Sequence, residues 1–209
     1  MRIRITFSKQ GSLRYTGHLD LHTLLERAAR RANLPLAYSQ GFHPTPKIQL
    51  ASALPLGFSS RAEIMDLWLT AECEIPMLRN DLQAALPRDI QILNMETVDD
   101  NAPPLQTQVV AAEYEVALPT EYAADLPSRL STVLNAGSLP RERRGKPYDL
   151  RPLIESLEVM PVDGSGNARI SMRLTAREGA TGRPEEVLST LEIPPESARV
   201  ERTRLIFQS

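Results

Sequence analysis

The segment Tyr38–Lys47 is rich in polar, aromatic and turn-forming residues, and its side chains suit the binding of a phosphorylated ligand. Lysine and arginine neutralise phosphate, whereas tyrosine and phenylalanine offer flat faces on which bases stack. Further arginines come just before this segment. The first set of candidate ligand-binding residues is Arg27, Arg30, Arg31, Tyr38, Gln40, Phe42, His43 and Lys47. A capped helix with surface arginines and a proline-rich turn would explain the same residues without a ligand.

A second basic segment, Arg141–Tyr148, holds four cations and one tyrosine around Gly145. We expect a mobile basic loop that closes on an anion, with a solvated hairpin loop as the alternative. Its candidate ligand-binding residues are Arg141, Arg143, Arg144 and Lys146. Arginines also alternate with other residues near both ends of the chain, and we expect them to line exposed sheet faces. They are Arg2, Arg4, Arg202 and Arg204.

Two histidines raise the question of a metal site, because His18 and His22 are spaced one helical turn apart. The glutamate that directly follows the first histidine in zinc-protease motifs is missing, and no third ligand is fixed. The motifs Gly-x-x-x-x-Gly-Lys-Ser/Thr, Gly-x-Gly-x-x-Gly and Gly-x-Ser-x-Gly, which cradle phosphates or present a nucleophile, are also missing. We therefore assign no metal ligand and no catalytic residue.

The composition indicates a folded protein of one or two domains, since 42% of the 209 residues are hydrophobic and 24% are charged. Cys73 is the single cysteine, so the chain cannot form an internal disulfide or hold an iron–sulfur cluster with cysteines. No apolar run reaches the length of a signal peptide or a membrane span. We expect a cytoplasmic protein that does not enter the membrane.

The small net charge of −2 conceals an uneven distribution. Residues 1–50 hold 8 Lys/Arg and 2 Asp/Glu, a net charge of +6, whereas residues 51–140 hold 4 and 13, a net charge of −9. Residues 141–209 hold 12 and 11, a net charge of +1. Basic ends around an acidic middle indicate an anion-binding face or a charged surface for a protein partner. Chance variation on a solvated surface is the alternative.

Sequence periodicity predicts the elements that position these residues. In the first half, strands are expected over Arg2–Ser8, Ile48–Leu54, Ala62–Thr70 and Ile90–Val98, and helices over His18–Asn33 and Pro76–Leu86. In the second half, strands are expected over Glu113–Leu118, Leu150–Met160, Ala168–Ala176 and Arg199–Phe207, and helices over Pro127–Ala136 and Pro184–Leu191.

Each half follows the order β-α-β-β-α-β, which is that of a ferredoxin-like unit. We predict an α+β protein of two tandem ferredoxin-like (βαββαβ) units with mostly antiparallel sheets, residues 1–98 and 109–209. The polar, proline-containing segment 99–108 is expected to be a linker. A single mixed sheet is the alternative.

Four motifs stand out between residues 18 and 47. They are His18-Leu19-Asp20-Leu21, Glu26-Arg27-Ala28-Ala29-Arg30-Arg31-Ala32, Leu34-Pro35-Leu36-Ala37-Tyr38-Ser39-Gln40-Gly41-Phe42 and Pro46-Lys47. They resemble the radical-SAM-associated domain of unknown function, which occurs alone or at the C-terminus of cobalamin-binding-type radical SAM proteins. The resemblance is specific over residues 1–70 and weaker beyond. Gly17 replaces the family's serine, and His22 stands where an apolar residue is expected.

The resemblance implies a partner for this chain. A separate radical SAM protein would carry the iron–sulfur cluster and S-adenosylmethionine, and no cofactor is expected on this chain. We expect an accessory module that has no catalytic activity of its own and binds a substrate for that partner. The family context implies that this substrate is RNA.

Two alternatives belong to other functional classes. By analogy of fold with CRISPR repeat-processing endoribonucleases, the chain could be a metal-independent endoribonuclease. His43 or His18 would then act as general base or acid, and Arg144 or Lys146 would stabilise the transition state. The chain could instead be a protein-docking module without its own ligand, with the acidic segment 51–140 as its docking face.

Overall fold

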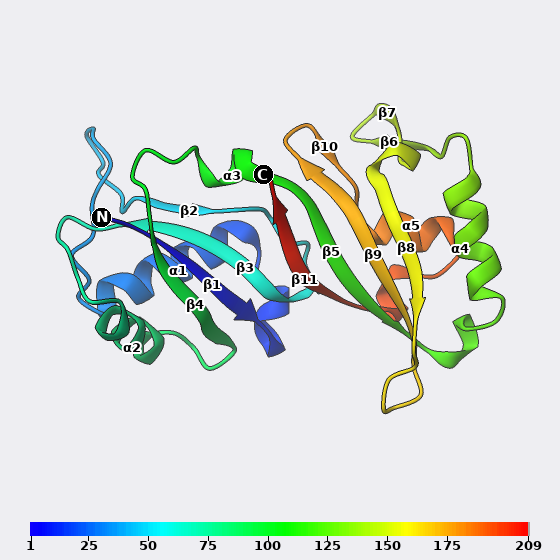
Figure 1. The fold of residues 1–209 in the computed structure, drawn as a ribbon, viewed down its shortest axis with the longest axis horizontal. Coiled ribbons are helices and arrows are strands. Elements are labelled where there is room, and N and C mark those ends of the chain that lie inside the picture. The colour runs from blue at the N-terminus through cyan, green and yellow to red at the C-terminus, as the bar shows by residue number, and fades with distance from the viewer. Residues whose placement is uncertain (209) are drawn as a thin grey trace. The chain divides into compact units, whose positions relative to one another are not determined.

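The alternating residues at the N-terminus form a strand at the centre of an antiparallel sheet. A computed structural model describes residues 1–208 and divides the chain into two units, of which unit 1 spans Met1–Gln108. Within unit 1 the strand order is β2-β3-β1-β4, and each of these pairings is antiparallel (Figure 1). The strands are β1 (Arg2–Lys9), β2 (Ile48–Leu50), β3 (Ser59–Trp68) and β4 (Ile90–Val98).

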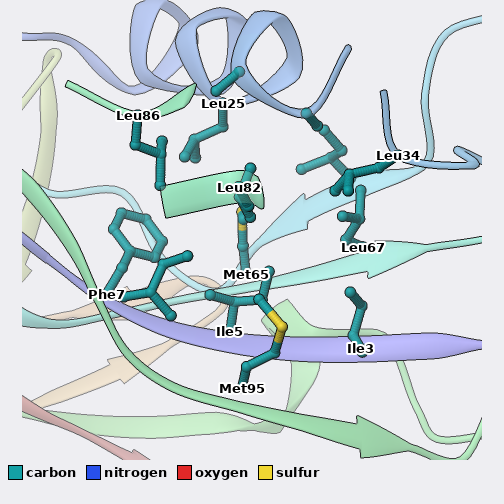
Figure 2. Close-up of a cluster of buried hydrophobic side chains, with 14 of the residues drawn as sticks. Ile3, Ile5, Phe7, Leu25, Leu34, Met65, Leu67, Leu82, Leu86 and Met95 are labelled. Carbon is teal, nitrogen blue, oxygen red and sulfur yellow. The ribbon is translucent and has the colours of Figure 1, made fainter. Parts of the chain in front are cut away.

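Two amphipathic helices supply the other half of the unit 1 core. They are α1 (His18–Arg31) and α2 (Ile75–Ala85). Their apolar residues pack against the alternate residues of β1 and β3, as Figure 2 shows. Core members with 0–1% exposure include Ile3, Ile5, Phe7, Leu25, Ala28, Met65, Leu67 and Leu82. Helix α1 stops short of its predicted end at Asn33, because Asn33 takes a left-handed conformation with φ of 51°.

The arginines of β1 do not line an exposed face, so that prediction was wrong. Asp66 on β3 is fully buried, and its Oδ2 accepts hydrogen bonds from Arg2 Nη2 at 2.6 Å and Arg4 Nη2 at 3.0 Å. Arg2 is 1% exposed, and its guanidinium lies 4.7 Å from the centroid of the Trp68 ring. The hydrogen bonds that Arg4 donates to the Asp66 carboxylate raise the pKa of Arg4. The alternation of residues in β1 correctly placed Arg2 and Arg4 on one face of the strand. Their burial depends on Asp66, which is distant from them in the sequence.

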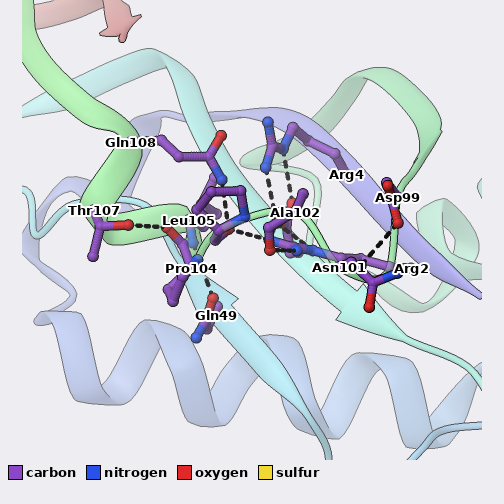
Figure 3. Close-up of polar contacts among 12 residues, drawn as sticks. Arg2, Arg4, Gln49, Asp99, Asn101, Ala102, Pro104, Leu105, Thr107 and Gln108 are labelled. Carbon is purple, nitrogen blue, oxygen red and sulfur yellow. Dashed lines mark hydrogen bonds and ion pairs between the residues drawn. The ribbon is translucent and has the colours of Figure 1, made fainter.

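The segment that follows β4 belongs to unit 1, whereas a linker was expected over 99–108. It ends in the short helix α3 (Leu105–Gln108). Arg2 donates hydrogen bonds to the carbonyl oxygens of Ala102 at 2.6 Å and Pro103 at 3.0 Å (Figure 3). Leu105 is fully buried, and its N–H donates to Gln49 Oε1 at 3.1 Å. The segment is polar and contains prolines, as a linker would, but these hydrogen bonds hold it against strands β1 and β2.

Unit 2 begins at Val109, and its principal strands pair in the same order as those of unit 1. Its antiparallel pairings run β8-β9-β5-β11, and β10 also pairs with β9. The strands are β5 (Val109–Leu118), β8 (Ile154–Met160), β9 (Ala168–Arg177), β10 (Ala180–Thr181) and β11 (Arg199–Phe207). The helices are α4 (Leu126–Asn135) and α5 (Pro184–Thr190). Both helices, β5 and β9 contribute buried apolar residues.

Two local features of unit 2 differ from prediction. Strand β8 begins at Ile154 instead of Leu150, because Arg151–Leu153 forms a 3-10 turn. On β11, Arg202 is fully buried whereas Arg204 is exposed, so the expected row of exposed arginines is also wrong here.

The whole is a mixed α+β fold with mostly antiparallel strand pairing and helices α1–α5 over residues 1–208. In this range no helix has both the length and the apolar character needed to cross a membrane.

Candidate functional site

The segment Tyr38–Lys47 forms a loop with a hydrogen-bonded base. Tyr38 and Pro46 form an isolated bridge, and the Lys47 N–H donates to the Ala37 carbonyl oxygen at 2.8 Å. Further up, the Ser39 N–H donates to the Thr45 carbonyl oxygen at 2.8 Å. Figure 1 shows the loop between α1 and β2 as a narrow light-blue projection from unit 1. Backbone hydrogen bonds fix the base of the loop, and the residues at its tip are exposed to solvent.

The tip of this loop exposes the side chains that the sequence singled out. Phe42 is 102% exposed, and Gln40 and His43 are exposed beside it. Gly41 has φ of 133°, a conformation that only glycine adopts readily, and it allows the chain to turn at this point. A phenylalanine with no contact to the core gains nothing from burial in the free protein. Its apolar ring is therefore available to a ligand.

The cations near the loop fall into two groups. Arg30 pairs with Glu26 at 2.9 Å, and its guanidinium lies 5.4 Å from the centroid of the Tyr38 ring. Arg30 thus holds Tyr38 against the C-terminal end of α1. The others are exposed and form no ion pair within residues 1–208. They are Arg27, Arg31 and Lys47.

The second basic segment forms a hairpin of β6 (Pro140–Arg143) and β7 (Lys146–Asp149), which was the alternative to a mobile loop. Its two turn residues, Arg144 and Gly145, have φ of 52° and 74°. Positive φ at both positions matches the twist of paired strands, but only glycine takes it without strain. Arg144 is held in this conformation at the tip of the hairpin.

A cavity of about 640 Å³ in unit 2 lies between this hairpin, Leu153 and the turn that joins β9 to β10. Arg143, Arg144 and Lys146 line it, and each is exposed and unpaired within residues 1–208. Asp149 is the acidic residue of the lining. Its Oδ1 accepts the backbone N–H groups of Leu139 at 2.7 Å and Arg151 at 2.9 Å, which lowers the pKa of Asp149. Asp149 stays ionised, but Arg143, Arg144 and Lys146 outnumber it, so the lining keeps a net positive charge.

Two side chains anchor the hairpin to α5. The Tyr148 hydroxyl donates to Glu186, and Arg141 Nη2 donates to Thr190 Oγ1 at 2.5 Å. Burial and the hydrogen bond to Glu186 raise the pKa of Tyr148 to about 12. Arg141 is a predicted ligand-binding residue, and its hydrogen bond to Thr190 also supports the hairpin.

Glu186→Gln should lower the pKa of Tyr148 from about 12 toward the ordinary value of 10.0, because the carboxylate charge disfavours tyrosinate. Because the pKa of Tyr148 is raised in the folded protein, the protonated hydroxyl stabilises the fold fully below pH 10. This contribution to stability is lost as the pH rises through about 12. Ultraviolet titration of tyrosinate, with the Tyr148→Phe curve subtracted, measures this shift. An unchanged titration in Glu186→Gln would show that the pair does not form.

The structure places the remaining candidates as follows. His18 and His22 lie in the first turns of α1, and His22 Nε2 is 3.4 Å from the Ile48 carbonyl oxygen. Within residues 1–208 there is no group of three or more His, Cys, Asp or Glu able to hold a metal ion. His18 and His43 belong to unit 1, whereas Arg144 and Lys146 belong to unit 2. The acidic segment 51–140 is divided between the two units.

Sequence reasoning missed the residues that complete the unit 2 cavity. Leu153 and Thr181 line it from segments outside the basic run, and Glu186 and Thr190 fix the hairpin from α5. No local pattern marks them, because their role depends on chain segments that meet only in the fold. The pair Arg144-Gly145 between two short extended runs was the available signal for the hairpin.

Fold and sites together define an α+β protein with an exposed aromatic loop in one unit and a cation-lined cavity in the other. The chain belongs to the family DUF2344, "Uncharacterized protein conserved in bacteria", whose family model matches residues 2–184. No curated protein matches it. A solved structure described as "Crystal structure of putative glycine cleavage system transcriptional repressor" is 10% identical. The match covers 100% of this chain and 97% of that one, with a TM-score of 0.25.

Proposed function

We propose that this protein is an accessory module that binds RNA as the substrate of a separate radical SAM protein. The observation that carries the RNA part is Phe42, which is 102% exposed at the tip of a fixed loop and is accompanied by exposed cations. An exposed aromatic ring is a stacking platform for an unpaired base, and nearby cations neutralise the backbone phosphates. Single-stranded RNA offers both groups together.

Each residue of the unit 1 site has a role in this proposal. Phe42 stacks on a base, and the Gln40 and His43 side chains form hydrogen bonds to base edges. The phosphates are contacted by Arg27, Arg31 and Lys47. Arg30 positions Tyr38 beside them, since its guanidinium lies 5.4 Å from the ring centroid.

The proposal also covers the localisation of the protein, which would be cytoplasmic, and its fold. We propose that both units are ferredoxin-like, because each has antiparallel strands in the same order and a helix after its first and third principal strands. The partner would carry the iron–sulfur cluster and S-adenosylmethionine, and this chain would carry the RNA. Mixing the purified chain with each radical SAM protein of the same organism tests the partnership. Failure to form a complex with any of them in size-exclusion chromatography would reject it.

Phe42→Ala should weaken binding of a fluorescently labelled 12-nucleotide single-stranded RNA by about 5- to 150-fold, the free-energy equivalent of about 1–3 kcal/mol for one stacked base. Fluorescence anisotropy at low salt measures this, because counterion release favours binding there. Met77→Ala is the matched control, since Met77 is an exposed apolar residue on α2. Absence of binding by the wild type, or equal binding by Phe42→Ala, would reject the proposal.

The salt dependence of binding to the same RNA tests the proposed phosphate contacts independently. Each of Arg27→Ala, Arg31→Ala and Lys47→Ala should reduce the slope of log K against log salt concentration by about 0.7, the value for one phosphate contact on a single strand. Arg88→Ala, which removes an exposed cation elsewhere on unit 1, should leave the slope unchanged. Equal slopes in all four variants would exclude these three cations as phosphate contacts.

A further inference from the structure

The cavity of unit 2 has the size of a ligand site. Its volume of about 640 Å³ falls within the range of roughly 300–1,000 Å³ typical of small-molecule sites. Its walls differ in character, because Arg143, Arg144 and Lys146 form a cationic side, whereas Pro147 and Leu153 contribute apolar surface. A ligand that matches both walls carries an anionic group at one end and a group with a flat apolar face at the other.

The lining of the cavity carries an excess of positive charge, with three cations and one carboxylate. Arg143 pairs with Lys146 across the turn in the hairpin register, so like charges lie close together. Asp149 carries one negative charge and forms no ion pair with these cations within residues 1–208, so it offsets only part of their repulsion. Arg144 stands at a left-handed position with φ of 52°, where glycine would be relaxed. An anion bound at the turn would relieve the repulsion among these cations.

The cavity is also formed before any ligand arrives. The Tyr148–Glu186 and Arg141–Thr190 hydrogen bonds join the hairpin to α5. The strands carry the cations in a defined register, so binding does not require the hairpin to become ordered. Prior order of this kind lowers the free-energy cost of binding.

We infer that this cavity binds a single phosphate-bearing nucleotide. The phosphate contacts Arg143, Arg144 and Lys146, and the sugar and base lie along Pro147, Tyr148 and Leu153. Inorganic phosphate alone would leave the apolar wall uncovered. The nucleotide is either a free mononucleotide or one unit of a bound RNA, and the second source rests on the proposed function.

Isothermal titration calorimetry with each of AMP, GMP, CMP and UMP tests the inference. At least one mononucleotide should bind, and it should bind at least ten-fold more tightly than its nucleoside or inorganic phosphate does. Arg144→Gly and Lys146→Gln should each weaken that binding at least ten-fold. Arg144→Gly removes the charge and relaxes the backbone at φ of 52°, so its melting temperature should equal or exceed that of the wild type.

Two controls separate this cavity from other cations and from the unit 1 loop. Arg199→Ala removes an exposed arginine of unit 2 outside the cavity and should leave mononucleotide binding unchanged, as should Phe42→Ala. Mononucleotide binding in a protein that binds no RNA would support the cavity and reject the RNA proposal. RNA binding unaffected by Arg144→Gly, without any mononucleotide binding, would overturn the cavity inference and leave the RNA proposal standing. Equal affinity for phosphate and mononucleotides would overturn the assignment of the ligand as a nucleotide.

Discussion

Replacing Asp66 by alanine should lower the free energy of unfolding of unit 1 by about 3–5 kcal/mol, the usual effect of leaving a buried charge without its partner. Asp66 is fully buried and accepts hydrogen bonds from both Arg2 and Arg4. Without it, the 1% exposed guanidinium of Arg2 keeps only its carbonyl acceptors in the segment that follows β4 and the Trp68 ring. Urea denaturation followed by circular dichroism measures the change.

A surface ion pair provides the comparison for Asp66. Glu26→Ala breaks the pair with Arg30, which is 47% exposed, and should cost less than about 1 kcal/mol. Hydrogen exchange should show the Asp66→Ala effect in the amides around Ala102 as well, because Arg2 donates to that carbonyl. Similar losses in Asp66→Ala and Glu26→Ala would contradict the view that the buried cluster stabilises unit 1.

Phe7→Ala should destabilise unit 1 by about 3–5 kcal/mol, because removing a buried phenylalanine loses its burial and leaves a cavity in the core. Phe7 is 1% exposed on β1 and belongs to the same cluster as Leu25, Leu82 and Leu86 (Figure 2). The close packing of this core leaves little freedom for neighbours to fill the space. The midpoint of urea denaturation should fall while the slope of the transition stays constant.

Phe42→Ala is the matched control for this prediction, since the same substitution is made at a residue that is 102% exposed. It should change the free energy of unfolding by no more than about 0.5 kcal/mol. The two substitutions should therefore have opposite effects. Phe7→Ala should lower stability, whereas Phe42→Ala should weaken RNA binding. A large loss of stability in Phe42→Ala would mean that the loop tip contributes to the fold.

Regular elements with clear periodicity were predicted closely. Strands β4 (Ile90–Val98) and β11 (Arg199–Phe207) have the predicted bounds, and helix α4 (Leu126–Asn135) differs by one residue at each end. Their apolar residues repeat at the spacing of a strand or a helix, which is a local property of the chain. The loop of Phe42 was also recognisable, because turn formers and polar residues interrupt any core period there.

Burial and site closure could not be inferred in the same way. The pattern of β1 identified Arg2 and Arg4 as residues of the face opposite Ile3 and Ile5, but it predicted exposure. The partner is Asp66, which lies 64 residues after Arg2 in the sequence. A charge is buried only where a distant group compensates for its lost hydration, and strand periodicity contains no information about that group.

The two candidate sites also differ in how far the sequence could predict them, because one is continuous in sequence and the other is not. The residue types and spacing of Tyr38–Lys47 were enough to mark a loop with stacking and phosphate-binding side chains, because the loop is continuous in sequence. The basic run Arg141–Lys146 indicated a positive charge, but its cavity also needs Leu153, Thr181 and the anchors on α5. Chain topology brings these segments together, so a concave site and the ligand that would fit it could be recognised only in the folded protein.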